Sequence, residues 1–190
     1  MKGTVFYSNV WDYITVHRQR RVNGNPVVAE DSAYSYANVD AKFYGLEADL
    51  RANLFDNFFL LGGASYVQGS KDTNSNLNIR DKDVAEVPPL KARLGLRYDT
   101  GFWFVEGETI ATATQNKVDS DLKEQKTSGY GILNLKAGVN YKNVALTAGV
   151  DNVLDKKYYE HNSLVRNPFM IGDKVPEPGR TFYLNASYRF

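Results

Sequence analysis

The sequence predicts an all-β fold, an antiparallel transmembrane β-barrel with about eight strands in this chain. Three observations predict this fold. Apolar side chains alternate with polar ones over long segments, these segments are about ten residues long, and the links between them alternate between short and long. A period of two places successive side chains on opposite faces of a strand, and about ten residues is the length that a tilted strand needs to cross a bilayer.

Residues 90–98 show the alternation most clearly. Leu94 lies on one face of this predicted strand, and Arg93 and Arg97 lie on the other. A register slip of one residue would turn the arginines toward lipid, at roughly 2 to 4 kcal/mol each near the bilayer midplane. Residues 3–16 look extended, but their pattern does not show which face is apolar. The same alternation is found in residues 44–50, 58–66, 103–111, 133–141, 144–150 and 182–190.

The links between these segments differ in length. Short links lie near residues 54–57, 99–101 and 142–143, and long polar links lie near residues 17–34, 68–87, 115–128 and 155–179. Outer-membrane barrels have short periplasmic turns and long extracellular loops, so we expect both chain termini on the periplasmic side. Aromatic residues near the strand ends fit the aromatic belts of the two membrane interfaces: Phe58, Tyr66, Tyr98, Trp103, Tyr141 and Tyr188.

Composition excludes several other classes of protein. The formal net charge is +1, from 23 basic and 22 acidic residues, and shows no electrostatic footprint for nucleic acid. The absence of cysteine excludes disulfide frameworks and thiolate-ligated metals. No segment reaches the roughly 18 apolar residues of a membrane-spanning helix. A soluble β-barrel or sandwich would also show alternation, but soluble barrels fill their interior with apolar side chains, whereas the second face here is charged.

Two segments near the C-terminus carry a resemblance to a known family. They are DNVLDKKYYEH at residues 151–161 and VPEPGRTFYLNASYRF at residues 175–190. The first resembles the N-L-F-D-x-x-Y element of TonB-dependent outer-membrane receptors, and residues 5–14, 44–54 and 87–98 resemble other barrel strands of that family. The positions that carry the terminal match are Asp151, Asn152, Leu154, Asp155, Tyr158, Gly179 and Arg180. We interpret this element as structural, because it ends a strand and opens the last loop.

The resemblance implies a barrel of about 22 strands with a plugged lumen, of which residues 1–190 would be the C-terminal part. The plug domain and the signal peptide of the family lie before the barrel, and we expect both to be absent from this chain. An open eight-stranded piece would expose unpaired backbone groups to lipid. We therefore expect either a longer chain or closure of these strands on themselves.

The resemblance also implies a location and partners. The location is the outer membrane of a Gram-negative bacterium, in contact with lipid and lipopolysaccharide. A TonB-type protein would supply energy through the missing plug. The last strand resembles the signal that the barrel-assembly machinery recognises, and the residues that carry this likeness are Phe182, Leu184, Ala186, Tyr188 and Phe190.

The function that the resemblance implies is active, TonB-dependent uptake of a metal chelate or vitamin, with siderophore-bound iron as the favoured cargo. We expect no enzymatic activity and no cofactor. Ligand contacts would come from the first and last long loops, where arginine suits an anionic chelate. Loop arginines also suit lipopolysaccharide phosphates. The candidates are Arg18, Arg20, Arg21, Tyr34, Tyr36 and Arg166.

Two other functions stay open at this point. A passive porin or small structural barrel would be closed by these eight strands alone. An outer-membrane lipolytic enzyme would use Ser163 near His161, although the chain has no GxSxG or HExxH motif. Glu160, His161 and Met170 are candidate metal ligands, but they are also ordinary residues for a long polar loop.

Overall fold

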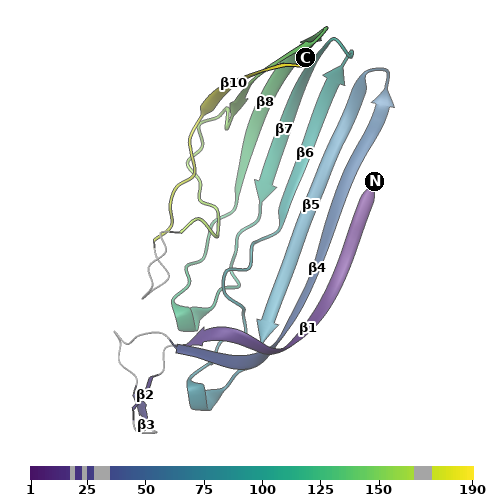
Figure 1. Cartoon of the computed structure of the whole chain (residues 1–190). Helices are drawn as coiled ribbons and strands as arrows, with labels where there is room; N and C mark the ends of the chain where they lie inside the picture. The colour runs from purple at the N-terminus through teal and green to yellow at the C-terminus, as the bar shows by residue number, and fades with distance from the viewer. Residues whose placement is uncertain (18–19, 23–24, 28–34, 165–172) are drawn as a thin grey trace.

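The chain forms one large antiparallel sheet in a computed structural model that describes residues 1–17, 20–22, 25–27, 35–164 and 173–190 (Figure 1). The sheet has eight strands, and each pairs with its neighbours in chain order. The strands are β1 (Lys2–His17), β4 (Ser35–Phe55), β5 (Phe58–Lys71), β6 (Lys91–Asp99), β7 (Trp103–Thr112), β8 (Tyr130–Tyr141), β9 (Val144–Asp151) and β10 (Thr181–Tyr188). The predicted fold class is confirmed, and the sheet is not closed, because β1 and β10 are its two edges.

Two short strands were not predicted. β2 (Arg20–Val22) and β3 (Asn25–Val27) form a separate hairpin within the first long link. No helix in the described parts of the chain has the length and apolar character to cross a membrane. The helical elements there are two 3-10 turns of three residues each, η1 (Ser75–Leu77) and η2 (Ser120–Leu122).

The short turns and the long links lie at opposite ends of the sheet (Figure 1). We call these ends the turn end and the loop end. Both termini lie toward the turn end (Figure 1). The link at Lys142 and Asn143 is the two-residue hairpin that the sequence predicts, with Lys142 in the left-handed region at φ 52°.

Strand lengths differ from the predicted ten residues. β4 has 21 residues and begins at Ser35, well before the predicted segment, and β5 continues to Lys71. At about 3.3 Å per residue, β4 is longer than even a tilted strand needs to cross roughly 30 Å of hydrocarbon. Its first part is polar on the face that is apolar elsewhere, with Asn38, Asp40 and Lys42 there. The apolar period therefore could not reveal that part.

The last strand is shorter than predicted. β10 ends at Tyr188 and does not reach Phe190. Its partner β9 begins at Val144, after the tight turn, so the ladder has no further partner residues. One backbone bond continues past the strand, from Arg189 N to Asn143 O at 2.8 Å.

A β-bulge explains why residues 3–16 are hard to interpret from sequence. The register between β1 and β4 shifts between Val10 and Tyr13, and Asp12 there has φ 56°. The Asp12 N–H is bonded to Asp40 Oδ1 at 3.2 Å. An extra residue exchanges the two faces, so the period of two is broken in the middle of β1.

One face of the sheet is apolar along its length. Cross-strand register places Leu46, Leu94 and Leu135 on this apolar face, and the alternate residues form the opposite, charged face. Aromatic rings pack across the turn end of the apolar face, with centroids 4.6 to 5.1 Å apart, in the order Phe55, Phe58, Tyr98, Trp103. Tyr44 and Tyr66 form a second pair at 6.3 Å toward the loop end. Two aromatic belts are the arrangement expected at two membrane interfaces.

The buried apolar core lies mainly at the loop end. Ile79, Val84 and Val87 come from the link between β5 and β6, and Val118 and Leu122 come from the link between β7 and β8. Val39 and Ala41 of β4 are buried as well. The long links are therefore folded structures that pack on the sheet.

Candidate functional site: the charged face and the loop clasp

Ion pairs cross the charged face from strand to strand. Arg93 of β6 lies 2.8 Å from Asp49 of β4 and 3.8 Å from Glu108 of β7. Gly63 lies beside this pair, and a Cβ there would be 2.6 Å from Arg93 Nε. All three charged groups are partly exposed, so each pair contributes little to stability by itself. They define a solvated wall with both signs of charge.

A second cluster lies nearer the turn end. Glu106 forms ion pairs with Arg97 at 3.1 Å and with Lys136 at 2.9 Å. The Arg97 guanidinium also pairs with Asp99 at 2.7 Å and lies 3.7 Å from the centroid of the Phe104 ring. Salt bridges and ring contact on three sides hold Arg97 in one position.

A third cluster joins the charged face to the last long link. Glu160 Oε1 accepts bonds from Lys91 Nζ at 2.8 Å and from the Tyr130 hydroxyl at 3.0 Å. The Tyr130 ring packs on Tyr158, with centroids 4.3 Å apart. The Lys91 ammonium, aided by the Tyr130 hydroxyl, outweighs partial burial and lowers the pKa of Glu160. This carboxylate is thus a fixed anion above the wall.

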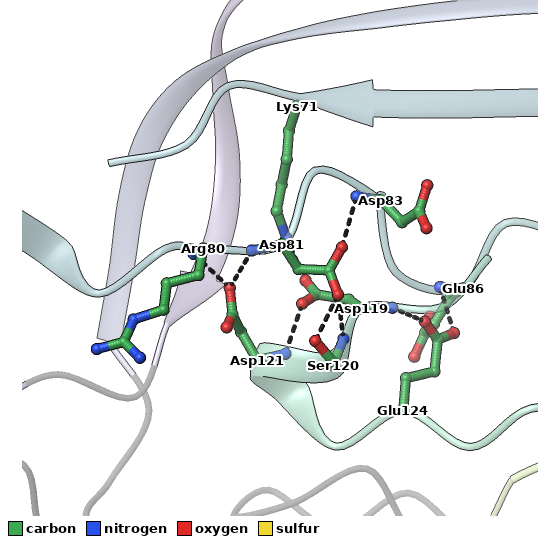
Figure 2. A network of polar contacts seen from close by, with 9 residues as sticks. All are labelled: Lys71, Arg80, Asp81, Asp83, Glu86, Asp119, Ser120, Asp121 and Glu124. Carbon is green, nitrogen blue, oxygen red and sulfur yellow. Dashed lines mark hydrogen bonds and ion pairs between the residues drawn. The ribbon is translucent and has the colours of Figure 1, made fainter. Parts of the chain in front are cut away.

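The densest polar network lies among the long links (Figure 2). We call it the loop clasp, and its residues are Lys71, Asp81, Asp119, Ser120, Asp121, Glu124 and His161. Lys71 from the end of β5 pairs with Asp119, and their side chains are 1% and 0% exposed. Burial raises the pKa of the Asp119 carboxyl, and the Lys71 ammonium opposes that rise. Removing one member would leave the other as an unpaired buried charge.

Asp81 and Asp121 exchange bonds between two links. Asp121 Oδ2 accepts from the backbone N–H groups of Arg80 at 2.7 Å and Asp81 at 2.8 Å. In return, Asp81 Oδ2 accepts from the backbone N–H of Ser120 at 2.9 Å and from the Ser120 hydroxyl. Carboxylate bonds to backbone N–H groups are charge-assisted and strong, so the two links are tied in both directions.

Glu124 connects three links. Its Oε1 accepts from Glu86 N at 2.7 Å and lies 3.0 Å from His161 Nε2, and its Oε2 accepts from Asp119 N at 2.7 Å. An ionised carboxylate only accepts, so Nε2 donates, and His161 Nδ1 lies 2.8 Å from the Thr127 hydroxyl. Burial opposes ionisation, but the bonds from His161, Asp119 and Glu86 prevail and lower the pKa of Glu124.

The same turn occurs in the link between β5 and β6 and in the link between β7 and β8. Residues 74–78 read NSNLN and residues 119–123 read DSDLK. In each, the first side chain accepts from the backbone N–H two residues later at 3.1 Å, and the last residue is left-handed, at φ 58° for Asn78 and φ 57° for Lys123. Sequence reasoning missed this pair, although the repeated Asx-Ser-Asx-Leu pattern could have revealed it.

The terminal sequence element forms a compact, hydrogen-bonded structure between β9 and β10, which we call the buckle. β9 ends at Asp151, and the buried Asn152 bonds to Lys156 N and O at 2.9 and 2.8 Å. Asp155 Oδ1 accepts from Arg180 N at 2.8 Å, and a Cβ on Gly179 would lie 2.6 Å from that oxygen. Of the other motif residues, Leu154 is exposed to solvent, and the Tyr158 ring packs on Tyr130.

Of the candidate ligand residues, the structure describes the side chain of Tyr36. Tyr36 lies on the outward, apolar side of β4 and is 74% exposed. The backbone of Arg20 and Arg21 forms β2. Arg18, Tyr34, Arg166 and Met170 lie outside the described residues.

The two histidines and Ser163 are placed as follows. His17 is buried at the loop end of β1. The His161 ring faces Thr127 and Glu124. The backbone N–H of Ser163 donates to Glu160 O at 3.3 Å, and the backbone carbonyl of Ser163 accepts from Val175 N at 2.9 Å. Glu160 turns to Lys91 and away from His161, and no group of three or more His, Asp or Glu placed to hold a metal occurs among the described residues.

Comparison with known proteins identifies the class. The family model described as TonB dependent receptor-like, beta-barrel matches residues 1–153. The chain therefore belongs to the β-barrel family of TonB-dependent receptors, which are transporters of the Gram-negative outer membrane and not enzymes. In barrels of this kind the outward face is apolar and the lumen is polar, and the long loops are extracellular whereas the short turns are periplasmic.

Solved structures agree with this class. The chain superposes on the copper transporter OprC with a TM-score of 0.79 and 30% identity, over 99% of this chain and 28% of that one. It superposes on the ferric-catecholate import receptor Fiu from E. coli K12 with a TM-score of 0.62 and 18% identity, over 99% and 25%. For the ferric enterobactin receptor PfeA of Pseudomonas aeruginosa the values are 0.64 and 21%, over 99% and 28%. A comparison with curated protein sequences found no match.

Proposed function

We propose that this chain forms part of the barrel wall of an importer that takes up a metal, as an ion or a chelate, with energy from a TonB-type protein. Family membership carries this proposal. The chain spans 28% of the length of OprC, and we propose that the whole receptor also contains a plug and a coupling segment.

Open sheet edges support a larger barrel. β1 and β10 each have one unpaired edge, and an unpaired edge is not tolerated in hydrocarbon. We infer that both edges pair with further strands of one barrel of about 22 strands. The outward residues Phe182, Leu184 and Tyr188 of β10 would carry the barrel-assembly signal and then face lipid.

We propose siderophore-bound iron as the cargo. The first loop carries the arginine-rich segment HRQRRVNGNP at residues 17–26, and guanidinium groups pair bidentately with anionic oxygen donors. The wall below adds Lys91, Arg93 and Arg97, each held by carboxylates. Copper is the second candidate, because the 30% identity is to a copper transporter.

Uptake by cells distinguishes the two cargoes. A strain that lacks the full-length receptor would be complemented with the receptor or with an empty vector, under iron or copper limitation. We expect receptor-dependent accumulation of radioactive iron supplied as a siderophore complex, lost when the TonB-type partner is removed. Receptor-dependent uptake of radioactive copper without iron uptake would establish the second candidate. Receptor-dependent uptake of neither metal would overturn the proposal.

A further inference from the structure

The three long links at the loop end described above share one polar network, and the first two also bury apolar side chains. The described residues 72–90, 113–129, 152–164 and 173–180 are called the loop cap here. Its first two links bury Ile79, Val84, Val118 and Leu122. Its third link joins them through His161, which is 4% exposed.

Several hydrogen bonds join the links to one another, so no single link can move away without losing bonds to the others. Glu124 binds all three, through Glu86 N, Asp119 N and His161 Nε2. Asn162 Nδ2 adds a bond from the third link to Glu86 O at 3.0 Å. If one link moved away alone, carboxylates and backbone N–H groups of the others would lose these partners, and buried apolar side chains would be exposed to water, both of which are unfavourable.

The cap is also fastened to the wall. Lys71 at the end of β5 reaches the buried Asp119 of the second link, and Lys91 of β6 reaches Glu160 of the third. The backbone N–H of Asp72 bonds to Asp40 O of β4 at 2.8 Å. A hinge at the base of one link would break these contacts as well.

We propose that the loop cap is a single cooperative lid fixed to the barrel wall. Its three links open together by local unfolding, and none of them swings as an independent gate. The extracellular location of the lid rests on the proposed function, whereas its cooperativity rests on the contacts alone.

Hydrogen exchange of the full-length receptor in detergent tests the lid. The variant Glu124→Ala removes the carboxylate that joins the links, and Asp83→Ala is the matched control, since its carboxylate makes none of the clasp bonds and points away from them (Figure 2). We expect exchange in Glu124→Ala to become about tenfold faster or more in all three links, and to stay unchanged in the control. Faster exchange in residues 113–129 alone would overturn the proposal.

A second variant covers the case in which Glu124→Ala does not fold. Asp121→Ala removes only the bonds to Arg80 N and Asp81 N, and neither residue belongs to the third link. If the links open together, hydrogen exchange must also become faster in residues 152–164, although neither of these two bonds reaches that segment. A change confined to the two links that Asp121 joins would show that the links open separately, and would overturn the single lid whatever the uptake assay shows.

Discussion

At the scale of single residues, the clasp depends on carboxylates that accept backbone N–H groups. Glu124 is the clearest case, because its two oxygens satisfy Glu86 N and Asp119 N in addition to the His161 ring. Such bonds have no period along the chain, so alternation could not predict them. The repeated Asx-Ser-Asx-Leu pattern at residues 74–78 and 119–123 could have indicated the two matching turns. His161, which sequence reasoning treated as a candidate metal ligand or base, is placed in this network.

Acid should release the clasp through Glu124. The folded-state pKa of Glu124 is lowered, so its contribution is present above the unfolded-state pKa of about 4.3 and is lost as the pH falls through the lower folded-state value. Glu124→Gln should cost about 1 to 3 kcal/mol at neutral pH, and nothing at a pH below both values. Thermal unfolding of both proteins across this range measures the difference. A difference that does not change with pH would refute the role of the ionised carboxylate.

A side chain at Gly179 should disturb the hydrogen bond between Asp155 and Arg180. A Cβ there would lie 2.6 Å from Asp155 Oδ1, the oxygen that accepts from Arg180 N. We expect Gly179→Ala to lower the free energy of unfolding by about 1 to 3 kcal/mol. Gly131→Ala in β8 is the control, since its nearest contact would be Ile110 O at 3.8 Å. Equal melting temperatures of the two variants would contradict the close approach.

At the scale of strands, alternation predicted which face of most strands is apolar, and the register agrees. Leu94 and Leu135, for example, both lie on the apolar face. The alternation of apolar and polar residues did not predict the structure where a strand has no continuous apolar face. The outer part of β4 lies beyond the aromatic pair Tyr44 and Tyr66, and the bulge near Asp12 exchanges the faces of β1. The hairpin of β2 and β3 has only three residues per strand, too few for a period.

Adjacent residues of β10 test the assignment of faces. Leu184 lies on the apolar face and is 68% exposed, and Asn185 follows it on the charged face. We expect Leu184→Lys to destabilise the receptor in phospholipid vesicles by up to about 2 to 4 kcal/mol, and Asn185→Lys to have little effect. Denaturant unfolding in vesicles measures both. A larger loss of stability in Asn185→Lys than in Leu184→Lys would contradict this assignment of the two faces.

At the scale of the whole molecule, the sheet is a wall that requires neighbours. Under the proposed function, its apolar face contacts lipid, its charged face lines the lumen of the barrel, and both of its edges pair with further strands. The terminal sequence motif identified the family, because the buckle around Asn152, Asp155 and Gly179 combines several residues of restricted conformation and contact. The cargo is harder to predict, since most candidate ligand residues are in the first and last loops, and their chemistry does not depend on the barrel pattern.

The structure of the full-length receptor, determined by electron cryo-microscopy in lipid nanodiscs, tests the central claim most directly. We predict that β1 and β10 each pair with a further strand of the same barrel, in a closed wall of about 22 strands, with the charged face toward a plug. Direct pairing of β1 with β10 in a closed barrel of eight strands would contradict the account.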